Sequence, residues 1–400
     1  MPASRVRGSG GFGPLPLRRR KGRRYARIGA RVLSLARVGL LGCCLSASAA
    51  EEIIESFLAR ATTENPRHTE ADVLVCRDGS LLAAWSEFYG GSRDDAPARI
   101  SAARSRDGGR TWEAPTTLQE NSGRANVMSV SLLRSRTGDV LFFYLQKNSL
   151  TDLKVYVRRS TDEAQTWGAP VLVTADPGYH VMNNARVIQL RSGRLLAPVA
   201  STARVWTKND DFRTSVYLSD DDGRTWRRSP TSVSAPKRGA MEPGLVERRD
   251  GRVLQIIRTQ TGYIWQSLSE DGGETWSAAE SWGIESPESP ATLAVVPGTG
   301  DWLLVWNPHV AWGDPEKTVL GANHGGPRTP LAAMLSRDEG KTWGPRRNLE
   351  EDPASTYAYT SVTFHAGRAL LTYYHFPVGG KLLSLKFKSV PLAWFAGERR

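Results

Sequence analysis

The sequence predicts an all-β protein that folds as a six-bladed β-propeller. The first observation is a repeat. The pattern S-x-D-x-G-x-T-W occurs five times, once with Ala for Gly, at intervals of 50 to 67 residues, and such a period corresponds to one supersecondary unit. Short apolar runs bounded by turn residues surround every copy, as is typical of β-strands. Only the stretch EEIIESFLARAT suggests the 3.6-residue period of a helix. Radial repetition of small sheets indicates a propeller.

The predicted elements follow the repeat in order. The copies occupy residues 105–112, 160–167, 219–226, 269–276 and 336–343. A strand is predicted directly before each copy, over residues 98–104, 153–159, 213–218, 263–268 and 331–335. An earlier strand in each unit follows a Gly turn, over residues 78–85, 138–145, 192–200, 250–258 and 300–307. With C-terminal strands at 359–367, 369–376 and 382–387, these units make six blades.

The repeated pattern has a structural explanation. Its Asp can accept hydrogen bonds from the backbone of its own turn, its Gly can adopt a positive φ, and its Trp can pack beneath the turn. The pattern contains no nucleophile beside a base, so the chemistry is expected elsewhere. In the second copy Ala164 replaces the Gly, which predicts a turn that is strained or of a different type.

Charge and cysteine content limit the class of protein. The chain has 400 residues and a net charge of +12, but residues 1–50 hold 11 of the 53 Lys and Arg and no acid. The remainder is nearly neutral, so we expect no nucleic-acid-binding face. Of Cys43, Cys44 and Cys76, cleavage near Ala49 would leave one, and a single cysteine forms no internal disulfide. Residues 51–400 are expected to form one closed domain.

The first 50 residues have the order of a secretory signal. A basic stretch, RRRKGRRYARIGAR, precedes the short apolar segment VGLLGCCLSA and the small residues SASAA. The apolar segment is too short to span a bilayer. We therefore expect residues 1–50 to direct export to the periplasm or the exterior, with lipoprotein attachment through Cys43 as a variant. The alternative is a disordered basic arm.

The five copies are Asp boxes, and the chain resembles the sialidase (neuraminidase) superfamily of six-bladed propellers, especially its bacterial BNR-repeat branch. The resemblance covers roughly residues 65–385. It implies an exo-glycoside hydrolase that acts on terminal sialic acid or a related acidic sugar, retains the anomeric configuration and uses no cofactor. In that family the boxes lie on outer hairpins, away from the substrate.

The chemistry of such a substrate explains the residue types that the family uses. A sugar whose anomeric carbon carries a carboxylate needs arginines, which bind carboxylates through paired hydrogen bonds. The same anion repels a carboxylate nucleophile, and sialidases use a Tyr instead. By resemblance, MEPGLVERRDGRVLQIIR supplies Glu242 as the base partner of the Tyr and Arg258 as a carboxylate ligand. Similarly, GPRTPLAAML supplies Arg328, and STYAYTSVT supplies Tyr359 as the nucleophile.

The acid and the first arginine are less sharply defined by the resemblance. The family carries its acid on the loop that here reads GGSRDDAPAR, so Asp94 and Asp95 are both candidates. True sialidases supply their first arginine from Arg-Ile-Pro, but the corresponding place reads NPRHTEADVLV. Arg67 or His68 stands close to that position, and a related glycoside with a different anionic sugar would fit this departure as well. The segment GYHVMNNARVIQL offers His180 and Asn184 as hydrogen-bonding partners for sugar hydroxyls.

Two other functions fit the same fold. A non-catalytic propeller could bind glycans or a protein partner, and a lyase or hydrolase could act on another acidic sugar. The six histidines are scattered, with no pair four residues apart, so we expect no metal site. The expected partner is a glycan with an acidic terminal sugar, without nucleic acid or stable membrane insertion, and the expected state is a monomer.

Overall fold

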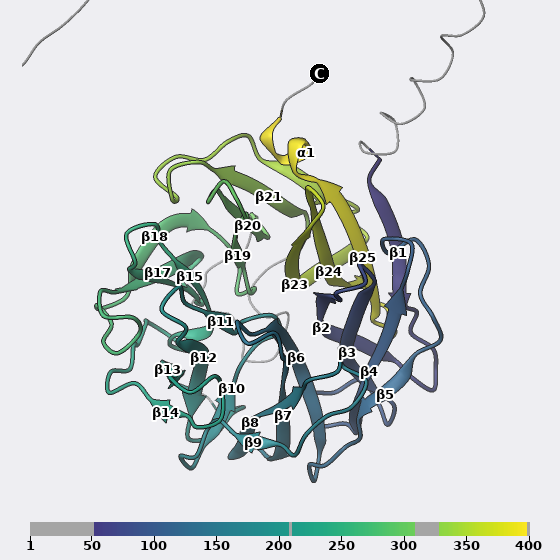
Figure 1. Ribbon diagram of the computed structural model, residues 1–400, viewed down its shortest axis with the longest axis horizontal. Helices are drawn as coiled ribbons and strands as arrows, with labels where there is room; N and C mark the ends of the chain where they lie inside the picture. Colours follow the sequence, from purple (N-terminus) through teal and green to yellow (C-terminus); the bar gives the residue numbers. More distant parts are fainter. Residues whose placement is uncertain (1–51, 208–209, 309–327, 398–400) are drawn as a thin grey trace, which may run out of the picture. The chain divides into compact units, whose positions relative to one another are not determined.

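A computed structural model describes residues 52–207, 210–308 and 328–397 of the chain. In these ranges the protein consists of β-strands and one five-residue helix, α1 (Leu392–Ala396) (Figure 1). The predicted all-β class is therefore confirmed. Among the described helices, none has the length and apolar character that crossing a membrane requires. The predicted export segment, with Cys43, lies outside the described residues.

Four of the described sheets contain four antiparallel strands each. The first comprises β2 (Arg67–Val75), β3 (Leu81–Phe88), β4 (Ala98–Ser105) and β5 (Thr116–Gln119). The second comprises β15 (Met241–Glu247), β16 (Val253–Arg258), β17 (Tyr263–Ser269) and β18 (Glu280–Glu285). The third comprises β19 (Thr292–Val295), β20 (Trp302–Trp306), β21 (Leu331–Ser336) and β22 (Arg347–Glu350). The fourth comprises β23 (Ser355–His365), β24 (Arg368–Pro377), β25 (Ser384–Pro391) and β1 (Ile54–Ala59).

A fifth sheet has nine strands and contains two repeat units. One unit is β6 (Asn126–Arg134), β7 (Val140–Ser149), β8 (Asp152–Ser160) and β9 (Val171–Leu172). The other is β11 (Ile188–Gln189), β12 (Leu195–Thr202), β13 (Arg213–Ser219) and β14 (Arg227–Arg228). Strand β10 (Tyr179–Val181) pairs with β8 and with β12 and so joins the two units. Because strand pairing does not separate them, the count of six blades stays a prediction.

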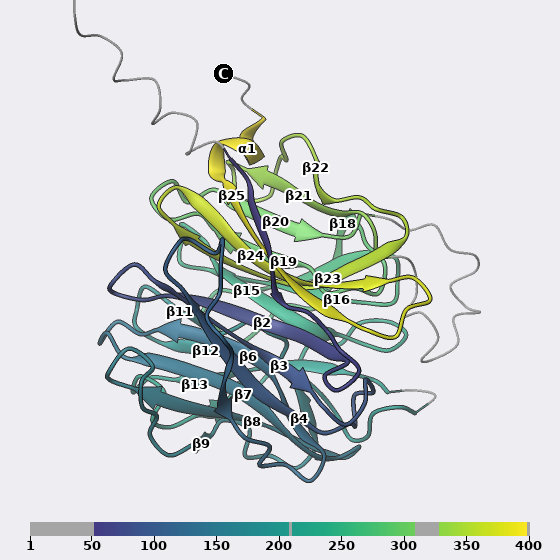
Figure 2. The same cartoon turned by 90° about the vertical axis from the view of Figure 1, so that its right-hand side faces the viewer.

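The innermost strands contact one another around a common centre (Figure 1). Strand β2 contacts β6 and β23, β15 contacts β12 and β19, and β19 contacts β23. The N-terminal strand β1 pairs with β25, so both ends of the described chain share one sheet (Figure 2). The helical period suggested for EEIIESFLARAT was therefore wrong, because the open edge of β25 offers this segment a ladder of hydrogen bonds.

The apolar core lies between neighbouring sheets. One cluster, for example, combines Leu254 and Ile256 of β16 with Leu293 of β19 and Trp302 and Leu304 of β20. Strand residues alternate between the two faces of a sheet, so each sheet contributes to the apolar layers on both of its sides. The strands predicted from the repeat units all form, because their apolar alternation matches this two-sided burial.

The Asp boxes have the local structure that their sequence predicts. In the first box, Asp107 accepts hydrogen bonds from the backbone N–H and the hydroxyl of Thr111, at 2.9 and 2.5 Å. The Ser105 hydroxyl donates to the same carboxylate and accepts from the backbone N–H of Gly109. Trp112 packs edge-on against Phe387, with ring centroids 5.1 Å apart. The box thus closes its own turn and packs on a neighbouring strand.

The second box settles the two alternatives for Ala164. Its backbone N–H donates to the Ser160 hydroxyl at 2.9 Å, as the Gly does in the other boxes. The turn is therefore of the same type, and Ala164 takes a φ of 62°. Since a Cβ atom disfavours this left-handed conformation, the strained alternative is the one observed.

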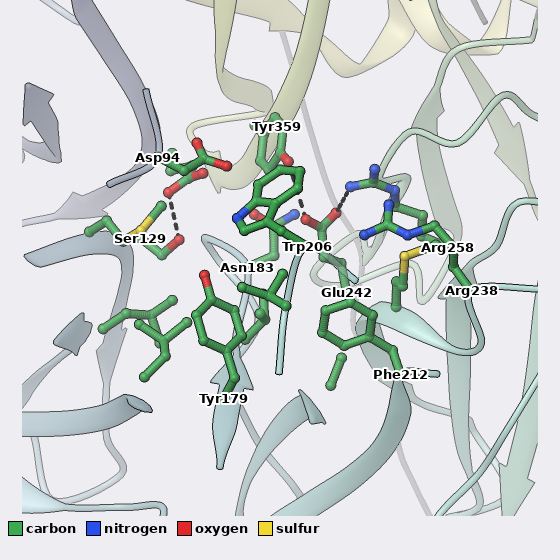
Figure 3. A pocket seen from close by; sticks show the side chains of 18 of the residues that line it. Asp94, Ser129, Tyr179, Asn183, Trp206, Phe212, Arg238, Glu242, Arg258 and Tyr359 are labelled. Carbon is green, nitrogen blue, oxygen red and sulfur yellow. Dashed lines mark hydrogen bonds and ion pairs between the residues drawn. The ribbon is translucent and has the colours of Figure 1, made fainter. Parts of the chain in front are cut away.

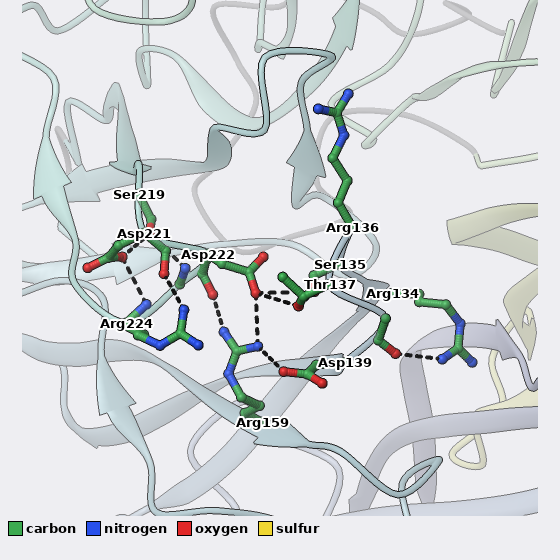
Figure 4. A network of polar contacts seen from close by, with 12 residues as sticks. Arg134, Ser135, Arg136, Thr137, Asp139, Arg159, Ser219, Asp221, Asp222 and Arg224 are labelled. Carbon is green, nitrogen blue, oxygen red and sulfur yellow. Dashed lines mark hydrogen bonds and ion pairs between the residues drawn. The ribbon is translucent and has the colours of Figure 1, made fainter.

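Ion pairs also connect the boxes to neighbouring hairpins. Asp222 of the third box accepts hydrogen bonds from the Thr137 hydroxyl, at 2.8 Å, and from Arg159 Nη1, at 3.0 Å (Figure 4). Arg159 also donates to Asp139 at 2.6 Å. This network joins the β6–β7 turn, strand β8 and the box that follows β13, so it fastens the two repeat units of the nine-stranded sheet together.

Candidate active site

Four inner strands each contain a β-bulge with one residue in a left-handed conformation. Pairing registers shift around Glu70 in β2, Ser129 in β6, Glu242 in β15 and Tyr359 in β23. Their φ angles are 55°, 53°, 38° and 59°. A bulge redirects a side chain, and strained backbone of this kind concentrates at functional sites. All four side chains line one cavity.

The cavity combines a polar rim with an apolar wall. Figure 3 shows Tyr359, Glu242 and Arg258 close together, with Asp94 and Ser129 on another side and the rings of Tyr179 and Phe212 below. The apolar lining comprises Met128, Leu145, Leu153, Val181, Ala200, Val205 and Met241. A mostly apolar concave site with a few converging polar groups is typical of small-molecule binding.

Tyr359 and Glu242 form a hydrogen-bonded pair. The Tyr359 hydroxyl donates to Glu242 Oε1 at 3.1 Å, and Arg258 Nη1 donates to Glu242 Oε2 at 2.6 Å. Burial and the Glu242 carboxylate raise the pKa of Tyr359 above its ordinary value, against the opposing effects of Arg258 and Arg328. The phenol is therefore neutral near pH 7, and Glu242 is placed to receive its proton when the phenol oxygen reacts.

Asp94 and Arg67 meet on another side of the cavity. Asp94 lies in the connection between β3 and β4, and its backbone oxygen accepts hydrogen bonds from Asn126 and Lys147, at 2.9 Å each. Arg67 Nη1 donates to Asp94 Oδ1 at 2.5 Å. Both side chains line the cavity. The site thus holds a carboxyl group, able to serve as an acid, beside an arginine whose side chain is 14% exposed.

The neighbouring candidate Asp95 points away from the cavity. Its side chain is 52% exposed and accepts a hydrogen bond from Arg93 Nε at 3.0 Å. Asp95 is not among the residues that line the cavity. Of the two adjacent aspartates, the structure brings only Asp94 to the other predicted site residues.

Arg328 lies behind Tyr359. Its guanidinium carbon is 5.6 Å from the centroid of the Tyr359 ring. Nη1 donates to the Tyr374 hydroxyl at 3.1 Å, and Nη2 donates to the backbone oxygen of Glu288 at 3.0 Å. Arg328 is buried and is not part of the cavity lining. From this position the positive charge of Arg328 favours negative charge on the Tyr359 phenol. The guanidinium acts on a ligand only through Tyr359, because it does not line the cavity.

Three other predicted binding residues also lie outside the cavity lining. His68 is buried and its Nδ1 accepts a hydrogen bond from Trp85 at 3.0 Å, because it occupies the opposite face of β2 from Arg67. Asn184 donates to the backbone oxygens of Ala71 and Tyr359 at 2.7 and 3.0 Å. His180 lies within 2.8 Å of the Ser201 hydroxyl. Asn184 therefore supports the bulge that carries Tyr359, and its neighbour Asn183 lines the cavity.

Comparison with known proteins assigns the family. The sequence pattern of the BNR repeat-like domain matches residues 79–372. This chain belongs to the BNR repeat-like domain family. The sialidase of Micromonospora viridifaciens is 30% identical to the chain over 236 residues, which are 53% of this chain and 36% of that protein. The sialidase of Bacteroides fragilis is 23% identical over 312 residues, 68% of this chain and 56% of that protein.

Solved structures share the fold of this chain. The Hadza microbial sialidase Hz136 superimposes with a TM-score of 0.65 at 18% identity, covering 83% of this chain and 67% of that one. This likeness shows a shared propeller fold. The predicted resemblance to the sialidase superfamily is confirmed by these comparisons. The chain spans 36% to 60% of the length of the curated relatives it matches.

The cavity lining also includes residues that the sequence did not predict as site residues. Glu70 and Ser129 occupy the bulges of β2 and β6, and a buried acid within the strand run TEADVLV is the signal that could have identified Glu70. Arg238, Trp206 and Phe212 come from connecting segments. Nothing in the repeat pattern marks these three positions.

Proposed function

We propose that this chain is a sialidase-like exo-glycoside hydrolase that acts on terminal sialic acid or a related acidic sugar. The observation that carries the proposal is the meeting of two groups in one cavity. One group is the Tyr359–Glu242 pair with Arg258, and the other is Asp94 with Arg67. These residues supply a neutral nucleophile with its base, an acid and two cations, which are the parts that cleavage of an anionic glycoside needs.

In the proposed reaction the Tyr359 oxygen attacks the anomeric carbon while Glu242 accepts the phenolic proton. The positive charges of Arg258 and Arg67 hold the carboxylate of the sugar. Arg328, behind the phenol ring, stabilises the phenolate character that develops before the bond forms. A covalent glycosyl–enzyme intermediate follows, and its hydrolysis retains the anomeric configuration.

Asp94 is the proposed acid and base. It would protonate the leaving oxygen in the first step and take a proton from water in the second. In the structure Asp94 accepts a hydrogen bond from Arg67, so the proposed acid lies beside an arginine that would bind the carboxylate of the sugar.

The rest of the proposal concerns the setting of the reaction. We propose that residues 1–50 direct export, so that a monomeric enzyme meets glycans outside the cytoplasm. The order of basic, apolar and small residues in that segment supports export.

The test is hydrolysis of a fluorogenic sialoside by the purified chain and by three variants. Tyr359→Phe should lower kcat/KM by about 10³-fold or more, because the nucleophile is lost. Asp94→Asn should lower it by about 10²- to 10⁴-fold, the range of a general acid. Asp95→Asn is the matched control, because this adjacent carboxylate faces solvent, and it should keep the parent rate.

Each alternative has its own outcome. A chain that cleaves other acidic glycosides but not the sialoside would be a hydrolase or lyase with another substrate. A chain that binds glycans and cleaves none would be a non-catalytic propeller. Equal activity of Tyr359→Phe and the parent chain would contradict the proposed nucleophile.

A further inference from the structure

The cavity contains a second hydroxyl–carboxylate pair that the proposed reaction does not use. The Ser129 hydroxyl donates to Glu70 Oε2 at 2.7 Å, much as the Tyr359 hydroxyl donates to Glu242. All four residues occupy bulges of inner strands at positive φ. The fold therefore aims two carboxylates into one site from equivalent positions on β2 and β15.

Glu70 lies against the arginine that the substrate would need. Its Oε1 is 3.7 Å from Arg67 Nη2, and its side chain is 5% exposed. Arg67 Nη1 is bound to Asp94 and to the backbone oxygen of Ser92. The guanidinium thus already faces two carboxylates, and an incoming anion at Nη2 would lie beside Glu70. Two like charges at this separation in a buried site repel strongly.

We propose that Glu70 is a specificity-determining residue, which competes with the anionic group of the substrate for Arg67 and admits acidic sugars only when it is uncharged. This inference rests on the proposed function of the same cavity. The proton comes from solvent, and a neutral Glu70 can keep its hydrogen bond to Ser129 while Arg67 turns to the sugar.

The charged and titratable groups around Glu70 come from every element packed against it. They are Arg67 on β2, Asp94 on the β3–β4 connection, Lys147 on β7, Tyr179 on β10, Glu242 on β15 and Tyr359 on β23. Burial, with smaller effects of Asp94 and Glu242, raises the pKa of Glu70 to about 7 against the opposing effects of Arg67 and Ser129. Glu70 is therefore mostly neutral below that pH and charged above it.

The experiment measures kcat and KM of the full chain for a fluorogenic sialoside between pH 5.5 and 8.5. For the parent chain, KM should rise about fivefold between pH 7 and pH 8, because the neutral, binding-competent fraction falls from about one half to about one eleventh. Above pH 8 the rise should approach about tenfold per pH unit. Glu70→Gln removes the charge at nearly constant size. Its KM should stay flat over this range and lie about tenfold below the parent value at pH 8, with kcat little changed.

The matched control is Glu247→Gln. Glu247 accepts hydrogen bonds from Arg191 and lines the separate cavity at the other side of the inner strands, so the variant removes one negative charge without touching this site. It should keep the pH dependence of the parent KM. Glu70→Ser is a second neutral variant, because Ser129 shows that serine is accepted at the equivalent bulge with a φ of 53°.

The outcomes separate this inference from the proposed function. If the parent chain turns over the sialoside and either neutral variant, folded by its unfolding temperature, shows the parent KM profile, the role of Glu70 is overturned. A variant that loses kcat at every pH would also overturn it, because the residue would then act in the chemistry. If the parent chain neither cleaves nor binds acidic sugars across the pH range, the proposed function fails and this inference fails with it.

Discussion

Arg238 connects two buried carboxylates that belong to different parts of the chain. Its Nη2 donates to Asp210 Oδ2 at 2.6 Å and its Nη1 to Glu288 Oε1 at 2.5 Å. Glu288 also accepts a hydrogen bond from Arg258 Nη2 at 3.4 Å. Asp210 in turn binds the backbone N–H of Thr207 at 2.7 Å. Arg238 is therefore a positioning residue, which ties the segment after β12 to the arginine beside Glu242.

The variant Arg238→Ala should be strongly destabilising. The Asp210 and Glu288 side chains are 0% and 1% exposed, and removing one partner of a buried ion pair costs about 3–5 kcal/mol. We expect this loss in the free energy of unfolding measured in urea. At a temperature where the variant is folded, KM should rise more than kcat falls, because Arg258 loses its alignment.

Arg213→Ala provides the control. Arg213 is 54% exposed and lies 3.7 Å from Asp211, and exposed pairs contribute about 0–1 kcal/mol. Equal destabilisation by Arg238→Ala and Arg213→Ala would show that the buried ion pairs stabilise the protein no more than an exposed pair does.

At the scale of the element, the Asp box is a turn closed by its own side chains. The five boxes share the same Ser–Asp–Thr hydrogen bonds. In four of them a Gly follows the Asp by two residues, and its φ lies between 82° and 93°. The local sequence therefore specifies the turn, and the Ala of the second box keeps the geometry at a cost in backbone strain.

Ala164→Gly should stabilise the protein. Relief of the left-handed strain, about 1–2 kcal/mol, exceeds the entropy that a Gly adds to the unfolded chain, about 0.4–1 kcal/mol. The net expected gain is about 0.5–1 kcal/mol in urea unfolding. The reverse change, Gly223→Ala, should destabilise the third box, since its Cβ would meet Leu195 Cδ1 at 3.3 Å. A loss of stability in Ala164→Gly would mean that the packing of the Ala methyl group outweighs the strain.

At the scale of the molecule, β1 completes the last sheet. It pairs with β25, the strand that would otherwise form an open edge. Glu55 of β1 also forms ion pairs with Lys386 and, at 3.1 Å, with Lys388. The first and last described strands thus lie in one sheet, and the ring of inner strands is held closed by residues far apart in the sequence.

Removing β1 should therefore weaken the whole fold. A chain that starts at residue 61 lacks this strand and leaves the edge of β25 unpaired, so it should unfold at a temperature lower by roughly 5 °C or more and associate more readily. A chain that starts at residue 52 keeps β1 and is the control. Identical unfolding temperatures for the two truncations would show that ring closure does not depend on β1.

Much of the fold could be predicted because it depends on local patterns. Strand alternation, Gly turns and the box residues act over a few positions, so the repeat units could be located from the sequence. The strand nature of 54–59 could not, because only the edge of β25, more than 300 residues away, supplies its partner. The joining of two units through β10 also depends on long-range pairing.

Local sequence patterns specify the all-β class, the box turns and the residue types from which the site is built. Only the tertiary structure decided which of two neighbours enters the cavity: Asp94 rather than Asp95, Arg67 rather than His68, and Asn183 rather than Asn184. Arg67 and His68 are neighbours in β2, where adjacent residues point to opposite sides of the strand. The other two pairs lie in connections between strands, where the path of the loop sets the direction of each side chain. The bulges of β2, β6, β15 and β23 arise from contacts between distant inner strands, so no short stretch of sequence specifies the direction of the side chains that they carry.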